Sequence, residues 1–386
     1  MGSTETFHAK TLKGLENTLA EELRLLGADN IEAVNRGVNF TGGRALLYKA
    51  NFCLRTALRI LMPISRFTAH NEQRLYTNIS RIDWSQYLTV KKSFVIDAVV
   101  FSKVYTNSLY VEQKIKDAIV DQFRERSSLR PPVNTKSPDV RINVHVNETS
   151  FLVSLDSSGD SLHKRGYKTQ SHMASINEVL AAGMVLLTDW RGEKPFIDPM
   201  SGSGTIAIEA ALIAGNIPPG VFRKRFAFED WLDFDPTLYE RVLENLPPTR
   251  EINVTINASD VDPEAIKMIH ANVRSAKLED IITISKIDFK EYPEQQDNAV
   301  VVMNPPYGER LVVSDIEAMY GDIGTTLKHR FGGSKAWLFT SNREALKHVG
   351  LKPDKKLTLY NASLECKYVK YSLFKGKLKE YKSNSI

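Results

Sequence analysis

The chain has 386 residues, of which 42% are hydrophobic and 25% charged, and its net charge is +5; this composition is ordinary for a globular protein, and the length predicts two or three domains. It contains no apolar run long enough to span a membrane, and its first residues, MGSTETFHAK, lack the apolar core of a signal peptide, so we expect a cytoplasmic protein without a membrane partner. The two cysteines, Cys53 and Cys366, lie outside any metal-binding motif, which argues against disulfide bonds and against a bound metal.

The positive charge is concentrated in the N-terminal part of the sequence. Residues 1–170 contain 24 Lys and Arg against 17 Asp and Glu, whereas residues 171–386 contain 27 against 29. A basic excess of this kind is typical of a surface that contacts a polyanion. The charge distribution therefore favours a polyanion contact in the N-terminal part, and an ordinary solvated surface is the alternative.

Residues 1–165 predict two small units that mix helices and strands, with a division near residue 65. In the first unit, leucines recur on one face of a predicted helix at 14–26, as in an amphipathic helix. The other elements expected there are strands at 6–9 and 37–41 and a helix that ends at 58. The second unit, residues 66–165, contains a predicted helix at 111–126 and predicted strands at 94–101, 140–146 and 151–155. We expect α+β folds for both.

From about residue 166 the predicted strands are separated by helices, which favours a parallel sheet. These strands are expected at 196–197, 252–258, 282–287, 299–303 and 336–339. The last two strand-like runs, 356–360 and 366–374, are joined by so few residues that they predict an antiparallel hairpin. A parallel sheet that ends in such a hairpin is the Rossmann-like layout of the class I S-adenosylmethionine (SAM) methyltransferases. One irregular stretch, 215–236, predicts an insertion over the edge of this sheet.

A glycine-rich turn follows the first of these strands, in the sequence FIDPMSGSGTIAIEAA at 196–211. Glycines let a ligand approach the backbone, and the N-terminus of the following helix offers free N–H groups. Asp198 suits an amino group better than a phosphate, and no Walker sequence follows. We therefore interpret this segment as a cofactor loop, although a plain tight turn is the alternative. Its candidate binding residues are Asp198, Ser201, Gly202, Ser203, Gly204 and Thr205.

Two further acidic residues follow the next two predicted strands. Asp260 ends one of them and could hold the hydroxyl groups of a ribose. Asp262 precedes Pro263 and is more typical of a helix N-cap. Asp288 could bind the exocyclic amine of adenine, with Phe289 packed beside the ring, or it could be an ordinary turn residue.

A fourth motif, Asn304-Pro305-Pro306-Tyr307, follows the apolar strand at 299–303. The Asn304 amide offers one acceptor and one donor group, and the prolines fix the backbone so that the Pro305 carbonyl points outward. Tyr307 provides a flat face for stacking a base. These four residues suit a planar heterocycle that bears an –NH2 group, and we interpret them as the catalytic motif, with Asn304 also close to the cofactor. A rigid loop with a surface tyrosine is the alternative.

Taken together, FIDPMSGSGT, SDVDP and NPPYGERL resemble the THUMP-containing RNA methyltransferases, and most closely the N-terminal half of the bacterial 23S rRNA guanine-N2 methyltransferases. FHAKTLKGLENTLAEELRLLGA, VEQKIKDAIVDQFRER and LDSSGDSLHKRGYK extend the resemblance over essentially the whole chain. It implies a ferredoxin-like domain at 1–65, an RNA-binding THUMP domain at 66–165 and a SAM-dependent methyltransferase domain at 166–386. Ser201 stands where relatives often carry cysteine. MASINEVLAA at 173–182 departs from the family pattern, and we assign no cofactor contact to it.

The function that this resemblance implies is methyl transfer from SAM to the exocyclic N2 of a guanine in 23S rRNA or a large-subunit precursor. The basic residues that we consider as RNA contacts are Arg124, Arg126, Arg130, Lys164 and Arg165. An N6-adenine methyltransferase that acts on RNA or DNA would use the same motif. A protein-glutamine methyltransferase and a ribosome-assembly factor with a vestigial SAM site are further alternatives.

Overall fold

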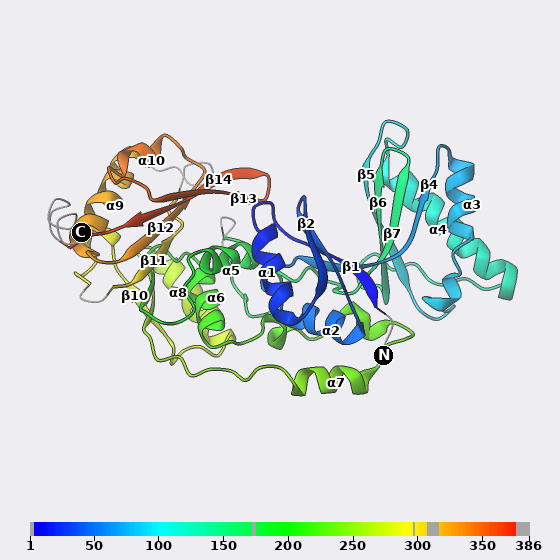
Figure 1. Ribbon diagram of the computed structural model, residues 1–386, viewed down its shortest axis with the longest axis horizontal. Helices are drawn as coiled ribbons and strands as arrows, with labels where there is room; N and C mark the ends of the chain where they lie inside the picture. The colour runs from blue at the N-terminus through cyan, green and yellow to red at the C-terminus, as the bar shows by residue number, and fades with distance from the viewer. Residues whose placement is uncertain (1–3, 172–174, 296–297, 307–315, 376–386) are drawn as a thin grey trace. The chain divides into compact units, whose positions relative to one another are not determined.

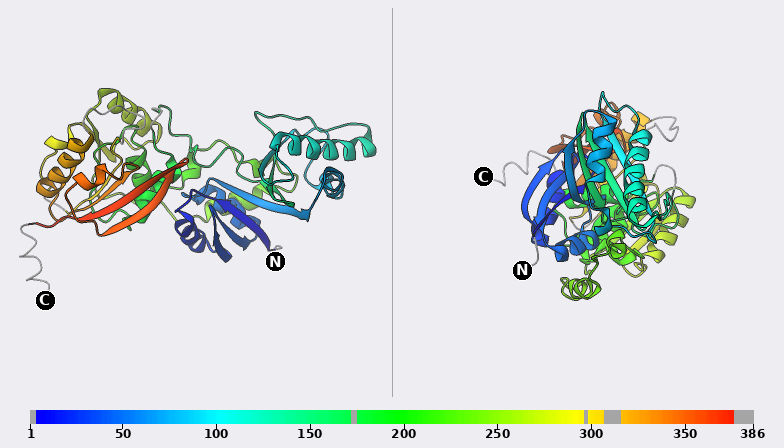
Figure 2. Two further views of the ribbon diagram at one scale, coloured as in Figure 1. Left: turned by 90° about the horizontal axis from the view of Figure 1, so that it is seen from above. Right: turned by 90° about the vertical axis from the view of Figure 1, so that its right-hand side faces the viewer.

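The computed structural model describes residues 4–171, 175–295, 298–306 and 316–375. The chain divides into two compact units (Figures 1 and 2). Unit 1 comprises Met1–Lys10, Ala20–Leu162 and Arg223–Leu246, and unit 2 comprises Thr11–Leu19, His163–Phe222 and Pro247–Ile386. A seven-stranded sheet forms the centre of each unit. Among the described residues, no helix has both the length and the apolar composition needed to cross a membrane.

The sheet of unit 1 has the strand order β2-β3-β1-β4-β7-β6-β5. Its strands are β1 (Glu5–Lys10), β2 (Asp29–Val34), β3 (Gly37–Gly42), β4 (Arg59–Thr68), β5 (Phe94–Phe101), β6 (Val140–Asn147) and β7 (Ser150–Asp156). The helices in this part of the sequence are α1 (Glu16–Leu26), α2 (Arg44–Cys53), α3 (Glu72–Ser80) and α4 (Ser108–Ser127). The strands predicted at 94–101, 140–146 and 151–155 are confirmed, whereas the helix expected to reach residue 58 ends at Cys53.

The strand β4 joins the two halves of this sheet, because it pairs with β1 on one side and with β7 on the other. The sequence analysis predicted no strand there. Pro63 lies within β4, next to a bulge between Pro63 and Ser65, and a proline inside an apolar run argues against a central strand. The bulge absorbs the missing N–H of the proline. The two predicted N-terminal units therefore share one continuous sheet.

The two faces of this sheet differ in composition. In β6, Val140, Ile142, Val144 and Val146 are buried, and the residues that alternate with them are polar, as expected for a sheet with one covered face. Helix α4 contacts β5 and α3, and the two helices lie together on one side of the sheet (Figure 1). The polar residues of β6 therefore lie on the face away from these helices.

The segment Arg223–Leu246 belongs to unit 1, so the predicted insertion over the edge of the parallel sheet is wrong for this part of 215–236. The reason is an aromatic cluster: the Tyr48 ring of α2 stacks on Phe228 at 4.6 Å between centroids and meets Tyr239 at 5.6 Å. Tyr239 lies on α7 (Pro236–Glu244), which contacts α2. Aromatic burial thus outweighs the proximity of this segment in sequence to the strands of unit 2.

The sheet of unit 2 has the order β10-β9-β8-β11-β12-β14-β13. Its strands are β8 (Phe196–Asp198), β9 (Ile256–Asp260), β10 (Ile282–Lys286), β11 (Val300–Met303), β12 (Lys335–Thr340), β13 (Lys355–Asn361) and β14 (Leu364–Ser372). All pairs from β10 to β12 are parallel, and β14 is antiparallel to both β12 and β13. This confirms the predicted parallel sheet with a terminal antiparallel hairpin. Its helices are α5 (Glu178–Leu187), α6 (Thr205–Ala214), α8 (Pro263–Ser275), α9 (Ile316–Arg330) and α10 (Ala345–His348).

The carboxyl ends of the central parallel strands meet at one edge of this sheet. β8 lies between β9 and β11 and is parallel to both. The last residues of these strands are Asp198, Asp260 and Met303. Ligands of open parallel sheets bind at such an edge, where the strand order changes direction.

Gly324→Ala should destabilise unit 2. A Cβ on Gly324 of α9 would lie 1.7 Å from the carbonyl oxygen of Val349, and relieving such a clash costs about 1–3 kcal/mol or more. Gly321→Ala on the same helix is the matched control, because its Cβ would lie 3.8 Å from the nearest atom and alanine stabilises a helix by about 1 kcal/mol relative to glycine. The urea midpoints of the two variants should move in opposite directions; a Gly324→Ala midpoint at or above that of the parent would contradict this packing.

Candidate cofactor and active site

A cavity of about 450 Å³ lies at this edge of the unit 2 sheet. Most of the residues singled out from the sequence line it, namely Ser201, Gly202, Ser203, Asp260, Asp288, Phe289, Asn304, Pro305 and Pro306. Asp198, Gly204 and Thr205 are buried beside it rather than among its lining residues. Tyr307 lies outside the described residues. The four motifs, which are far apart in the sequence, are therefore brought together around one space.

The glycine-rich turn is held by hydrogen bonds within itself. The Ser201 hydroxyl donates to the Asp198 carbonyl oxygen at 2.6 Å, and the Gly204 N–H donates to the Ser201 carbonyl oxygen at 2.9 Å. Gly202 has a φ of +56°, and a Cβ added to it would meet no atom within 4 Å. The Gly202 backbone therefore faces open space, which leaves room for a ligand to approach it closely.

Asp198 is the buried acidic group of the site. Its side chain is fully buried, and neither carboxylate oxygen has a hydrogen-bond partner among the residues that the structure describes. Burial raises the pKa of the Asp198 carboxyl to about 8 and the charge of Asp260 adds to the rise, against smaller opposing effects of the nearby Ser201 hydroxyl and the Ala207 N–H. An acid without a partner destabilises a folded protein. This position is therefore better suited to receiving a positively charged group than to packing alone.

The Asp260 carboxylate, at the end of β9, is hydrogen-bonded to the glycine-rich turn. One of its oxygens accepts from the Gly202 N–H at 2.9 Å and the other from the Asp262 N–H at 3.0 Å. A carboxylate has about four acceptor positions, so these two bonds leave capacity for a ligand. Asp262 caps α8 by accepting from the Glu264 N–H, with Pro263 as the first helical residue, which confirms the N-cap prediction.

Asp288 has features of both of its predicted interpretations. It caps a short 3₁₀ turn by accepting from the Lys290 N–H at 3.0 Å, and it also lines the cavity. Phe289 is buried in the core of unit 2, where its ring stacks on Phe331 at 5.6 Å between centroids. It reaches the cavity as part of an apolar wall. The core therefore fixes the Phe289 ring in place.

Asn304 follows the last residue of β11. Its amide oxygen is buried and has no hydrogen-bond partner among the described residues. Pro305 is buried and Pro306 is half-buried, and all three residues line the cavity. The site thus contains a second unused polar group, and this one is an acceptor on the cavity wall.

Several lining residues were not found from the sequence. They are Ser175, Ile176, Pro199, Met200, Ile206, Val261, Asp262, Ala265, Met268, Ile287, Lys290 and Met319. Most are apolar, and an apolar residue beside a cavity has the same periodicity as one in the core. Ser175 and Ile176 lie in the segment to which no contact was assigned. Asn177, which caps α5 by accepting from the Val179 N–H at 2.9 Å, was the available signal that a helix starts at this edge.

One of the proposed RNA contacts is wrong. The Arg165 side chain is only 1% exposed, and its Nε lies 3.3 Å from a Glu209 carboxylate oxygen. The Tyr167 hydroxyl donates to the same oxygen at 2.9 Å. Arg124 and Arg126 are exposed but form ion pairs. Arg165 therefore stabilises the interior of unit 2, because a buried cation requires a partner.

Within the described residues, no group of three or more His, Cys, Asp or Glu side chains is arranged to hold a metal ion. Asp260 and Asp288 each accept a hydrogen bond from a backbone N–H, and the Asp198 carboxylate oxygens have no hydrogen-bond partner among these residues.

Three protein-family models match the chain. The model described as the RMKL-like methyltransferase domain matches residues 165–370, the THUMP domain matches 69–156 and the RlmL ferredoxin-like domain matches 6–61. Similar curated proteins include the ribosomal RNA large subunit methyltransferases K/L of Syntrophotalea carbinolica and Vibrio campbellii, at 35% and 36% identity over 95% and 97% of this chain. The chain spans only about half of these two relatives, 53% and 54% of their lengths. A protein of Synechocystis named as an RNA methyltransferase is 35% identical over 96% of this chain and 98% of its own length.

Solved structures agree on the fold. SMU.472, described as a methyltransferase and solved with SAH, superposes with a TM-score of 0.88 and 31% identity over 98% of this chain and 100% of its own. A protein of Listeria monocytogenes described as an N6-adenine-specific DNA methylase has a TM-score of 0.85 and 29% identity over 96% of this chain and 97% of its own. TrmN of Thermus thermophilus, at 20% identity and a TM-score of 0.70 over 96% of this chain and 100% of its own, shares the fold. The chain belongs to the RMKL-like methyltransferase family, whose members are SAM-dependent enzymes.

Proposed function

We propose that the protein transfers a methyl group from SAM to the exocyclic N2 of a guanine in 23S rRNA. The observation that carries the proposal is the buried amide oxygen of Asn304, which has no hydrogen-bond partner within the described part of the chain and lies on the same cavity as the glycine-rich turn. An acceptor in that place suits an –NH2 group on a planar base. The match to the THUMP domain and the names of the K/L relatives support RNA, and large-subunit rRNA in particular, as the substrate.

The residues of the cavity fit SAM. The Asp198 carboxylate, whose oxygens have no hydrogen-bond partner in the described segments, would neutralise the amino group of the methionine part of SAM, across the turn at Gly202. Asp260 would accept from the ribose hydroxyls with its remaining acceptor positions, and Asp288 and Phe289 would lie beside the adenine. When bound, SAM supplies the electrophilic methyl group.

The remaining task of the protein is to align the methyl acceptor. Asn304 accepts a hydrogen bond from the amino group of the base, and the Pro305 carbonyl is proposed as the second acceptor. Because Pro305 and Pro306 have no N–H, no backbone donor competes at this corner. Tyr307 would stack on the base. Holding the base in this orientation accelerates the reaction without a nucleophilic side chain.

An N6-adenine methyltransferase is the second candidate function. The Listeria structure, which is described as an adenine-specific DNA methylase, has the same fold over almost the whole chain. Adenine also carries an exocyclic –NH2 group, so Asn304 would serve it equally well. The THUMP match favours RNA over DNA but does not distinguish guanine from adenine.

Methyl transfer from labelled SAM to RNA distinguishes these functions. RNA from cells that lack the gene should accept label, whereas RNA from the parent cells should already be modified. Nucleoside mass analysis should show N2-methylguanosine in the large-subunit rRNA. Label in N6-methyladenosine would support the second candidate, and label in DNA alone would overturn the proposal of an RNA substrate.

Asn304→Ala should reduce turnover about 100-fold or more, because it removes the group that aligns the acceptor. The affinity for SAM, measured by calorimetry, should change little, since the contacts of Asp198 and Asp260 remain. Circular dichroism should show an intact fold. Turnover equal to that of the parent would mean that Asn304 is not part of the catalytic site.

Asp198→Asn should weaken SAM binding at least tenfold, because a neutral amide cannot balance an ammonium group. It should also change the pH dependence of stability. The folded protein keeps the Asp198 proton up to about pH 8, whereas the unfolded chain releases it near pH 4. Because only the unfolded chain releases this proton between about pH 4 and about pH 8, unfolding of the parent becomes progressively more favourable as the pH rises through that range.

The stability of the ligand-free parent, relative to Asp198→Asn, should accordingly fall by about 1 kcal/mol for each pH unit in that range. Urea unfolding of both proteins at about pH 5 and about pH 7.5 measures this difference. An equal difference at the two pH values would show that Asp198 ionises normally in the folded protein.

A further inference from the structure

Asn272 is a buried amide that joins two parts of unit 2 that are far apart in the sequence. It lies near the end of α8 and is fully buried. Its amide oxygen accepts from the backbone N–H groups of Thr169 and Gln170 at 2.9 and 3.0 Å. Its amide nitrogen donates to the carbonyl oxygens of Gln170 and Ser203 at 2.8 and 3.0 Å. Both ends of the amide are therefore engaged, and Asn272 connects segment 165–170 to the glycine-rich turn.

The bond to Ser203 fixes one peptide group of the glycine-rich turn. The Ser203 carbonyl oxygen accepts from Asn272, and the N–H of the same peptide group, that of Gly204, donates to the Ser201 carbonyl oxygen at 2.9 Å. The glycines on either side of Ser203 have φ values of +56° and +79°, so this backbone has more conformational freedom than one built of larger residues. Two hydrogen bonds, one at each end of the peptide group, restrict that freedom. Because Ser203 lines the cofactor cavity, its peptide group helps to set the shape of the cavity wall.

Helix α8 also packs directly on this turn. A Cβ added to Gly204 would lie 3.2 Å from the Ile269 side chain, so the helix approaches the glycine closely. Ile269 and Asn272 are three residues apart on α8, and residues at this spacing are neighbours on one face of a helix. The same face of α8 therefore supplies both the packing contact and the hydrogen bond that hold the turn.

Lys168 provides a second contact between segment 165–170 and the cavity wall. Its ammonium group donates to the Ile176 carbonyl oxygen at 2.8 Å, and Ile176 lines the cavity. The Lys168 side chain is 13% exposed and lies 4.0 Å from the Glu178 carboxylate, which balances its charge. Segment 165–170 thus holds two stretches of the wall, one through Asn272 and one through Lys168.

We propose that Asn272 and Lys168 are positioning residues for SAM binding, although neither lines the cavity. Without the Asn272 amide, the Ser203 peptide group loses one of its two restraints, and binding of SAM would have to restore its orientation. The inference rests on the part of the proposed function that places SAM in the unit 2 cavity. It does not depend on which nucleic acid or which base accepts the methyl group.

The test measures the SAM affinity of the full chain by calorimetry and methyl transfer to RNA at saturating SAM. Asn272→Ala should weaken SAM binding about 10- to 100-fold, the range seen when residues that orient the direct ligands of a bound metal are removed. Turnover at saturating SAM should stay within about threefold of the parent, because bound SAM restores the turn and Asn304 is unchanged. This split is the opposite of that expected for Asn304→Ala.

Two further variants test the individual contacts. In Asn272→Asp, the carboxylate still accepts from the N–H groups of segment 165–170 but cannot donate to the Ser203 carbonyl oxygen, so SAM binding should fall at least as far as in Asn272→Ala. Lys168→Met removes the bond to the Ile176 carbonyl oxygen and keeps a long apolar side chain. It should weaken SAM binding about 2- to 10-fold, the effect of one hydrogen bond.

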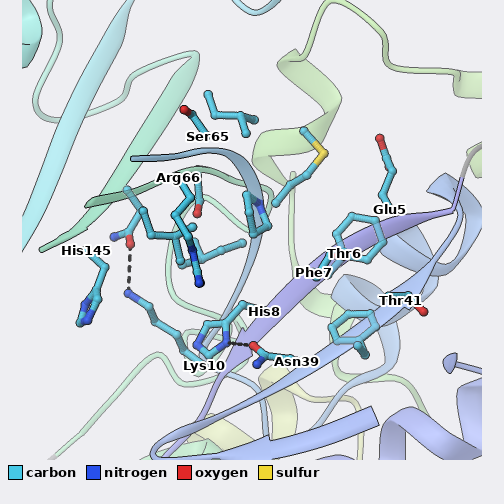
Figure 3. Close-up of a pocket in the computed structure, with 18 of the residues that line it drawn as sticks. Glu5, Thr6, Phe7, His8, Lys10, Asn39, Thr41, Ser65, Arg66 and His145 are labelled. Atoms are coloured by element: carbon cyan, nitrogen blue, oxygen red, sulfur yellow. Dashed lines mark hydrogen bonds between the residues drawn. The ribbon is translucent and has the colours of Figure 1, made fainter. Parts of the chain in front are cut away.

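Unit 1 offers two matched controls. Asn51 of α2 is only 1% exposed and donates to the Leu47 carbonyl oxygen at 3.0 Å and to the Ser157 hydroxyl at 2.9 Å, so Asn51→Ala also removes a buried amide. Asn39 lines a separate cavity of unit 1, where its amide oxygen forms a hydrogen bond with the His8 ring at 2.8 Å (Figure 3). Among the described residues, none lines both this cavity and that of unit 2. Asn51→Ala and Asn39→Ala should bind SAM as the parent does.

Circular dichroism and urea unfolding identify the variants that fold. Parental SAM affinity in folded Asn272→Ala, or an equal loss of affinity in Asn51→Ala, would overturn the inference. If Asn272→Ala does not fold, Lys168→Met decides, and parental SAM affinity in that variant would overturn it.

The same measurements separate this inference from the proposed function. If Asp198→Asn weakens SAM binding while Asn272→Ala and Lys168→Met bind SAM as the parent does, the positioning roles are wrong and the SAM site stands. If Asn272→Ala weakens SAM binding although the parent transfers no methyl group to RNA, the proposed substrate is wrong and the positioning role is supported.

Discussion

The parallel pairing of β8 with both β9 and β11 is the constraint on which the catalytic unit depends. It brings the carboxyl ends of three strands to one edge, and each strand ends in a segment with a different chemical character. After β8 comes the glycine-rich turn, after β9 the Asp260 carboxylate and after β11 the Asn304 amide. The Gly202 N–H bond to Asp260 then joins the first two segments directly. The strand order thus brings the three segments around one cavity, and the helices of unit 2 bury the two faces of the sheet.

Much of this arrangement could be predicted from the sequence. The strand–turn–helix at Asp198 and the apolar strand before Asn304 have strong local patterns, and the short connection between the last two strands allowed only an antiparallel hairpin. The predicted residues that line the cavity could be recognised because polar or glycine residues at strand ends stand out from the buried strands beside them. Lining residues such as Met268 and Met319 have no such contrast, so their position beside the cavity appears only in three dimensions.

Other predictions failed because tertiary packing outweighed local pattern. Pro63 argues against a central strand in the sequence, but a bulge next to it accommodates the proline, and β4 joins the two halves of the unit 1 sheet. Arginine is usually a surface residue, but Arg165 lies in the interior, where its guanidinium forms an ion pair with Glu209. The segment Arg223–Leu246 interrupts the sequence of unit 2, and its aromatic residues bury themselves in unit 1 instead. In each case the deciding partner lies far away in the sequence, where no local window can detect it.

Buried polar groups of unit 2 differ in whether another residue balances them. The Arg165 guanidinium and the Tyr167 hydroxyl meet on one oxygen of Glu209, which compensates the burial of the arginine and gives it a structural role. The Asp198 carboxylate oxygens and the Asn304 amide oxygen are buried and have no hydrogen-bond partner among the described residues, at the edge where the parallel strands end. Leaving such groups unsatisfied costs stability. Both groups lie at the cavity, so the proposed function offers a partner for each: the amino group of SAM for Asp198 and the amino group of the base for Asn304.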